Sequence, residues 1–192
     1  MTLASLDERV GAQVRALRAA RGLTLEALAD LAGVSRAMLS RVERGESSPT
    51  AQLLNRVCGG LGVTLSALFA EAEGPAASPL VRRDAQPTWR DPATGYLRRA
   101  VSPAGTGSPV DLVEVEFPAG GVVAFEAQPL LRADQHVWVL DGTIEVALGG
   151  DAVRLGRGDC LWMRFGQPIT FRNLAARPAR YAVIIGREAG RP

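Results

Sequence analysis

The stretch Thr24–Gly45, TLEALADLAGVSRAMLSRVERG, decides the fold of the first part of the chain. Its first half predicts a short helix that Thr24 can cap, because threonine favours the position before a helix. Gly33 then breaks this helix, and glycine tolerates the positive φ that a tight turn needs. Ser35 can cap a second helix over Arg36–Arg44, which Gly45 closes. Two short helices joined by such a turn predict a helix-turn-helix.

The second of these helices has two chemically different faces. Val34, Leu39 and Val42 are apolar and are predicted to pack inward, while the small Ala29 lets the two helices cross. The outward positions are Arg36, Ala37, Ser40, Arg41 and Arg44. A helix with one apolar stripe and one polar face sits on the surface of a protein.

The outward face suits the major groove of DNA. A helix of about ten residues spans roughly 15 Å, and arginine is the commonest partner of guanine O6 and N7. We predict that Arg36 and Arg41 read bases, with Ala37 and Ser40 near the groove floor. Phosphates are expected at Arg44, the Ser47-Ser48 pair and the N-terminus of the next helix. The complete predicted DNA-binding set is Ser35, Arg36, Ala37, Ser40, Arg41, Arg44, Ser47 and Ser48. A helical hairpin with a solvated arginine face is the alternative.

Further helices flank this pair. Before it, apolar residues recur at three- and four-residue spacing, which predicts a helix with one buried face that ends at Gly22: Leu6, Val10, Val14 and Leu17. After it, Pro49 is expected near the first turn of a fourth helix that runs toward Gly59-Gly60. Thr64 can cap a last helix carrying Leu65, Leu68 and Phe69. Residues 1–72 are therefore predicted to be a five-helix domain, and residues 73–79 a linker.

Residues from about Leu6 to Phe69 resemble the xenobiotic-response-element (lambda-repressor-like) helix-turn-helix family. The segment RALRAARGLTLEALADLAGVSRAMLSRVERGESSPT fits the pattern of that family almost throughout. The resemblance implies an ion pair between Arg18 and Glu43, so that Glu43 is a brace and not a DNA contact. Leu25 departs from the pattern, because phage repressors of the family often have a DNA-contacting glutamine there.

Beyond the linker the apolar period changes to two. Val113, Val115 and Phe117 alternate with glutamates, and the segment 137–146 is β-branched and aromatic around Asp141-Gly142. Further strands are expected at Leu161–Phe165, Ile169–Arg172 and Tyr181–Ile185. Many short strands with regular glycine and proline turns predict a barrel or jelly roll over residues 80–188.

This second half resembles a cupin in the segments VLDGTIEV (139–146) and LGRGDCLWMRFGQPITFRN (155–173). The resemblance implies a divalent metal held by two His and a Glu of the first motif and one His of the second. Here the glutamate position falls on Gln135, the second-motif histidine on Ile169, and the first-motif pair on Gln128 and Leu130. An insertion would shift that pair to Glu126 or Pro129 instead. The lone histidine, His136, is expected on the other face of its strand.

Leucine and isoleucine donate nothing to a metal, so no metal and no other cofactor is predicted. The barrel interior is instead expected to hold an apolar pocket with a few polar groups, as small-molecule sites do. The predicted lining is Gln128, Gln135, Val137, Val139, Met163, Ile169 and Phe171. The alternative is a barrel filled by side chains that serves only for dimerisation.

Composition excludes several classes of protein. The 192 residues carry a net charge of +2, with all 22 basic residues arginine, and hold one histidine and two cysteines. Cys58 and Cys160 cannot form a disulfide scaffold, and neither is expected to be a redox sensor. No apolar run is long enough for a membrane span and the first ten residues do not read as a signal peptide, so a cytoplasmic protein is expected.

Together these patterns predict a multidomain α and β protein: a non-enzymatic, homodimeric transcriptional regulator that binds double-stranded operator DNA. Its cupin-like domain would dimerise and sense a small-molecule effector without metal. Two other functions stay open. One is an antitoxin-like module whose β-domain binds a protein partner, and the other is a metal-free cupin enzyme with an acid and a base inside the barrel.

Overall fold

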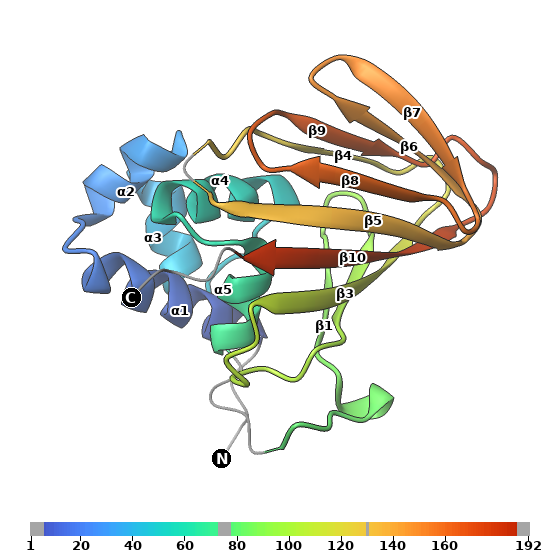
Figure 1. Cartoon of the computed structure of the whole chain (residues 1–192). Coiled ribbons are helices and arrows are strands. Elements are labelled where there is room, and N and C mark those ends of the chain that lie inside the picture. The colour runs from blue at the N-terminus through green and yellow to red at the C-terminus, as the bar shows by residue number, and fades with distance from the viewer. Residues whose placement is uncertain (1–5, 73–77, 130, 188–192) are drawn as a thin grey trace.

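The computed structural model describes residues 6–72, 78–129 and 131–187 (Figure 1). Its first part holds the five expected helices, namely α1 (Leu6–Ala20), α2 (Leu25–Ala32), α3 (Arg36–Glu43), α4 (Ala51–Leu61) and α5 (Leu65–Ala72). The predicted caps are confirmed: Thr24 accepts from Ala27 N and Ser35 accepts from Met38 N. Gly33 ends α2 in the left-handed region, with φ 62°.

The fourth helix begins close to Pro49, as predicted, but it is longer than expected. Thr50 is its cap and accepts a hydrogen bond from Leu53 N, so Pro49 lies just before the helix. The helix also continues through Gly59 and Gly60 and ends at Gly62, where φ is 65°. Glycine at position 60 allows α2 to pack closely against α4, since an added Cβ would lie 3.1 Å from Leu28 Cδ1.

The described residues after the helices form ten strands in two antiparallel sheets. The strands are β1 (Thr88–Arg90), β2 (Leu97–Ala100), β3 (Val110–Phe117), β4 (Val122–Phe125), β5 (Ala133–Asp141), β6 (Thr143–Leu148), β7 (Asp151–Gly156), β8 (Cys160–Arg164), β9 (Ile169–Arg172) and β10 (Ala179–Arg187). One sheet has the order β1-β2-β3-β10-β5-β8 and the other the order β4-β9-β6-β7. From β3 onward the chain crosses repeatedly between the two sheets, and β3 pairs with the last strand, β10. This is jelly-roll topology, the architecture of cupins.

Four strands, β1, β2, β4 and β7, were not foreseen from the sequence. None of them shows a clear apolar alternation, since β2 reads LRRA and β7 is exposed over its first four residues. Each is held by backbone pairing with a neighbouring strand. For example, β7 pairs with β6 along its whole length, with Gly156 opposite Thr143. Backbone pairing of this kind leaves little mark on the pattern of side chains.

The helices gather at one end of the barrel and contact it directly (Figure 1). Aromatic rings continue across the junction, beginning with Phe69 of α5, whose ring centroid lies 5.5 Å from that of Trp89. The contacts go on through Tyr96, Phe117 and Tyr181 to Phe171 inside the barrel. The helical and β regions therefore share one continuous core.

No helix within the described residues is both long and apolar enough to cross a membrane. Most of the predicted linker, residues 73–77, lies outside the described part of the chain.

Candidate functional site

The recognition helix α3 is fixed from beneath by two close contacts. Arg18 of α1 holds Glu43 at the end of α3 through Nε–Oε1 and Nη2–Oε2 hydrogen bonds of 2.6 and 2.8 Å. Gly11 lets α1 approach so closely that an added Cβ would lie 2.2 Å from Val42 O. The brace implied by the family resemblance is thus present, whereas the close approach at Gly11 was not anticipated.

The outward face of α3 carries the predicted base-reading arginines. Arg36, Ala37 and Arg41 are exposed, while Leu39 and Val42 are buried beneath them. Among the described residues neither Arg36 nor Arg41 forms an ion pair, so both guanidinium groups are available to a ligand. Ser35 caps the start of the helix and Ser40 is half-buried in its second turn.

Several of the residues assigned to phosphates have protein partners. Arg44 pairs with Glu46 at 2.6 Å and also donates to Ser40 Oγ, and the bond to Arg44 lowers the pKa of the Glu46 carboxyl. The Ser48 hydroxyl donates to Asp7 Oδ2. The Ser47 Oγ is buried without a hydrogen-bond partner among the described residues, so it does not face a phosphate here. Arg44 and Ser48 would have to exchange these partners to bind DNA.

The expectation that the N-terminus of the fourth helix meets a phosphate is wrong. Ala51 N, in the first turn of α4, donates to Asp91 Oδ1 at 2.9 Å, and Asp91 is almost fully buried. Asp91 lies just after β1 and its other oxygen accepts from Thr94 N. A carboxylate of the β region thus occupies the place that an anion would take at this helix end.

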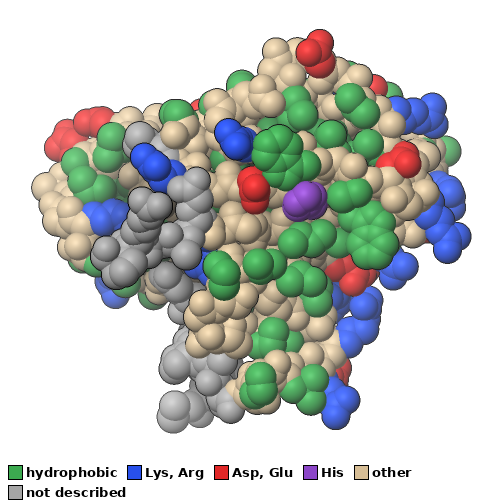
Figure 2. Space-filling view, viewed as in Figure 1, with side chains coloured by type: hydrophobic (Ala, Val, Ile, Leu, Met, Phe, Trp, Pro, Cys, Tyr) green, Lys and Arg blue, Asp and Glu red, His purple; other side chains and the backbone are tan. Residues whose placement is uncertain are grey.

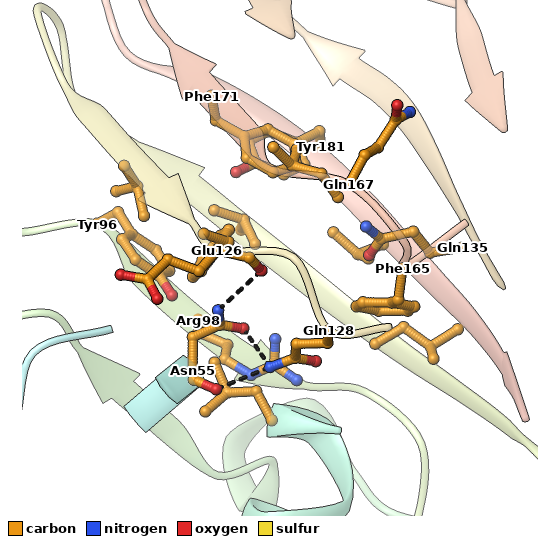
Figure 3. A pocket seen from close by; sticks show the side chains of 17 residues that line it. Asn55, Tyr96, Arg98, Glu126, Gln128, Gln135, Phe165, Gln167, Phe171 and Tyr181 are labelled. Carbon is orange, nitrogen blue, oxygen red and sulfur yellow. Dashed lines mark hydrogen bonds between the residues drawn. The ribbon is translucent and has the colours of Figure 1, made fainter. Parts of the chain in front are cut away.

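A second feature is a cavity of about 70 Å³ where the barrel opens toward the helices (Figure 3). Its helix side is formed by Asn55 of α4 and Leu65 of α5, and its barrel side by residues of both sheets. Figure 3 shows Arg98, Asn55 and Gln128 together at one end, with Gln135, Phe171 and Tyr181 on the strands. The cavity therefore joins the two halves of the chain.

Four of the seven residues predicted to line a barrel pocket do border this cavity: Gln128, Gln135, Ile169 and Phe171. The other three, Val137, Val139 and Met163, are buried in the barrel core and are not part of its lining. They point inward as expected, but neighbouring side chains fill the space in front of them. The cavity lies at the end of the barrel nearest the helices.

Several polar residues of the lining were not predicted from the sequence. Tyr96, Arg98 and Tyr181 are each more than nine-tenths buried and border the cavity, together with Asn55 of the helical part. Tyr96 and Arg98 are two residues apart, a spacing that places side chains on one face of an extended segment. A buried arginine is rare enough that no pattern of apolar residues predicts it.

The residues at the cupin metal positions do not fit a divalent metal. Gln128 uses its amide nitrogen to bond Asn55 O and Oδ1, each at 2.7 Å, and Ile169 offers only an alkyl group. Glu126, the alternative ligand, pairs with Arg56 at 2.7 Å. Leu130 lies outside the described residues. Within the described ranges no three His, Cys, Asp or Glu side chains converge as a metal site would require.

The two cysteines and the histidine lie away from the cavity. Cys58 is fully buried in α4, and burial raises the pKa of its thiol to about 12. His136 faces outward from β5, as the strand period predicted, with its Nδ1 3.9 Å from the exposed Cys160 Sγ. None of these three residues belongs to the cavity lining.

Comparisons with known proteins agree with this architecture. A family model described as Helix-turn-helix matches residues 14–68. The chain is 28% identical over 164 residues to the HTH-type transcriptional regulator SutR of Escherichia coli, covering 83% of this chain and 84% of that protein. It is 38% identical over 69 residues to the transcriptional regulator ClgR of Mycobacterium tuberculosis, covering 36% of this chain and 62% of ClgR.

Among solved structures, an HTH_3 family transcriptional regulator from Vibrio cholerae superposes with a TM-score of 0.77. The two chains are 24% identical, and the superposition covers 96% of this chain and 98% of the other. The order of helices and strands is therefore shared over nearly the whole length. Residues 14–68 therefore match a helix-turn-helix domain, and the strands after them form a jelly roll.

Proposed function

We propose that this protein is a homodimeric transcriptional regulator that binds operator DNA in the cytoplasm and senses a small molecule through its barrel. In this proposal residues 1–72 bind DNA and residues 80–188 dimerise and sense, with residues 73–79 between them. Relatives named as transcriptional regulators support the general role. The observation that carries the proposal is the braced helix α3, which presents two unpaired arginines on one exposed face.

The DNA contact follows from the geometry of α3. Its N-terminal residues would enter the major groove, where a bidentate arginine can distinguish guanine from other bases. The Arg18–Glu43 brace holds the helix at a fixed angle, so that both exposed arginines approach the groove together. Selection of bound sequences from a random DNA pool tests this step, and failure to enrich any sequence would refute it.

A dimer would place two copies of α3 on one operator. One recognition helix covers few base pairs, whereas a two-fold pair reads two half-sites a helical turn apart. The outer face of the larger sheet offers a surface for such a contact, because side chains form a row across four strands. In register, Leu112 of β3, Ile184 of β10, His136 of β5 and Trp162 of β8 lie side by side.

This row belongs to an apolar patch that Figure 2 shows around the single histidine. Leu112, Trp138 and Trp162 each expose more than two-fifths of their surface, which is unusual for three large apolar side chains on one sheet face. Tryptophan is enriched where proteins bind one another tightly. We assign this face to contact with a second copy of the chain, since a two-fold axis through the row pairs it with itself.

Light scattering coupled to gel filtration tests the dimer. Trp138→Glu should convert a dimer into a monomer, because it buries a charge in the contact. Val153→Glu on β7 is the matched control, since Val153 is similarly exposed on the other sheet. A wild-type monomer, or a dimer that survives Trp138→Glu, would refute this surface.

The cavity is suited to sensing because a bound molecule would touch both halves of the chain. Gln128 connects the barrel to Asn55 of α4, and α4 packs against α2 of the helix-turn-helix at Gly60. A ligand changes DNA affinity only if it binds one arrangement of these elements better than the other. Measuring operator affinity with a panel of metabolites tests this step. If no metabolite changed the affinity, the barrel would serve only for dimerisation.

The lining gives little support to the enzymatic alternative. Glu126 is the one carboxylate among the described lining residues, and its charge is paired with Arg56. General acid–base chemistry needs two groups whose protonation states differ and that converge on a substrate. A protein partner recovered in equal amount with the chain would instead favour the antitoxin-like alternative.

A further inference from the structure

The most unusual group in the cavity is the guanidinium of Arg98. Arg98 lies on β2 and is only 8% exposed, although its charge is expensive to remove from water. Buried charges in proteins are normally paired with an opposite charge. Among the described residues, however, no carboxylate lies within 4 Å of Arg98, and its hydrogen bond is one from Nη2 to the hydroxyl of Ser66.

Other polar groups around Arg98 also lack partners. Tyr96 and Tyr181 are each 5% exposed and Gln135 is 6% exposed, yet none of their side chains forms a hydrogen bond within the described residues. None of these polar atoms is sealed off, because they border the cavity. A guanidinium, two phenol hydroxyls and an amide thus offer unused donors to the same space.

The charges around the cavity favour an anion. Glu126 is neutralised by Arg56, which leaves the charge of Arg98 uncompensated on this side. Burial raises the pKa of both tyrosines, although the nearby Arg98 partly opposes the rise, so both hydroxyls keep their protons as donors. Asp111 borders an open groove on the far side of Arg98, where its carboxylate pairs with Arg187 at 3.5 Å and also attracts Arg98 from beyond ion-pair distance. An anion would be repelled by Asp111 in that groove, so the favourable side of Arg98 is the cavity.

We propose that the cavity binds a small organic anion, whose charged group takes the bond that Arg98 lacks and accepts hydrogen bonds from Tyr96 and Tyr181. The rest of the ligand would lie against Phe171 and Ile169, which provide an apolar wall. A volume of about 70 Å³ admits only a small molecule. The ligand is therefore a short carboxylate, or a phosphate or sulfonate ester of similar size.

This inference rests on the proposed sensing role and adds a mechanism to it. Arg98 also bonds Ser66 and lies 5.7 Å from the ring of Phe69, so it contacts α5 at two points. An anion that draws the guanidinium into the cavity would change its contact with α5. The occupied and empty states would then differ where the barrel meets the helices.

Thermal unfolding of the full chain, titrated with matched probes, tests the anion site. Butyrate, methyl phosphate and methanesulfonate distinguish the three kinds of anion, and butyramide is the neutral analogue of butyrate. At least one anion should raise the melting temperature in a saturable way, while butyramide should not. Arg98→Met should weaken that response about 10- to 100-fold, as loss of a charged hydrogen-bonding partner does. Arg99→Met is the control, because Arg99 follows on the same strand and bonds Arg83 O outside the cavity.

Tyr181→Phe provides a second variant should Arg98→Met fail to fold, and it should weaken the response about three- to tenfold. The inference is overturned if no anion gives a saturable shift, if butyramide matches butyrate, or if both variants respond like the wild type. Operator binding separates this result from the proposed function. Anion binding without an effect on DNA affinity supports the site and refutes the sensing role. A neutral effector that acts equally on wild type and Arg98→Met supports sensing and overturns the anion site.

Discussion

The surface of α3 and the cavity at the barrel end both present arginines without a carboxylate partner, but in opposite surroundings. Arg36 and Arg41 are exposed to water, which solvates a charge at little cost. Arg98 is only 8% exposed and is enclosed by aromatic rings and amides, so little water reaches its charge. An arginine without an ion pair is common on a protein surface, whereas one in the core indicates a binding site for an anion. Position in the fold therefore decides what the same side chain indicates.

Arg98→Met gives the sharpest test of this difference. A buried cation without a counter-charge opposes folding, so its replacement by an apolar side chain should raise the free energy of unfolding by about 1–4 kcal/mol. The matched change on the surface, Arg36→Met, should stay within about 0.5 kcal/mol of the wild type. Urea unfolding of the three proteins measures both.

A loss of stability in Arg98→Met would contradict the idea that burial makes Arg98 unfavourable for folding. Arg98 would then be a structural tie between α5 and the barrel, held there by Ser66 and Phe69. Equal stabilisation by both substitutions would instead show that burial makes no difference to these arginines.

The affinity for DNA should depend on the exposed arginines of α3. Arg36→Ala and Arg41→Ala should each weaken specific binding by about 1–3 kcal/mol and relax the preference for one base. Arg164→Ala on β8 serves as the control, because it removes the same charge from a strand of the barrel. Affinity for the selected operator and for single-base variants measures the effect. Unchanged base preferences in both α3 variants would refute their role as base readers.

Loss of the Arg18–Glu43 ion pair should lower the stability of the helices more than that of the barrel. Glu43→Gln keeps the shape of the side chain but removes the charge that Arg18 binds, so it should lower the stability of the helical part by about 1–2 kcal/mol. Unfolding followed by amide exchange separates α1 and α3 from the strands. A uniform loss over both regions would show that they unfold as one unit, as their shared core allows.

The smallest expected effect concerns the edge of the recognition surface. Glu46→Gln removes the acid that pairs with Arg44 and frees this arginine for a phosphate. DNA affinity should rise by about two- to threefold, equally for all sequences, because phosphate contacts carry no base preference. Filter binding over a range of salt concentrations measures it, and a fall in affinity would show that Glu46 orients Arg44 for DNA.

Local signals in the sequence predicted the helical part well. Thr24, Gly33 and Ser35 act within one turn of their own position, and the structure shows each in its expected place. The fourth helix was misjudged at Gly59-Gly60 because glycine also permits close packing between helices. Its N-terminus was misjudged because the capping carboxylate, Asp91, lies 40 residues further along the chain.

The barrel was foreseen where apolar residues alternate, as along β3 and β5, but its cavity was foreseen only in part. Gln135 and Phe171 were assigned to the lining because their strands were recognised. Arg98 was not, because β2 has no alternation and because no local rule places a charge in a core. Which inward side chains border a cavity depends on how both sheets and the helices meet.

Residue type, helix and strand period and capping were enough to predict the helix-turn-helix and the exposed arginines of α3. They also placed no histidine at the metal positions that the cupin resemblance implies, and all of these signals act over a few residues. The bond from α4 to Asp91, the bond between Gln128 and Asn55 and the burial of Arg98 without an ion pair among the described residues depend instead on how the whole chain packs. Each of these contacts joins residues at least 30 positions apart, or depends on an enclosure that such contacts create. Enclosure from water is a property of the packed chain, and it gives an ordinary arginine the chemistry of a binding site.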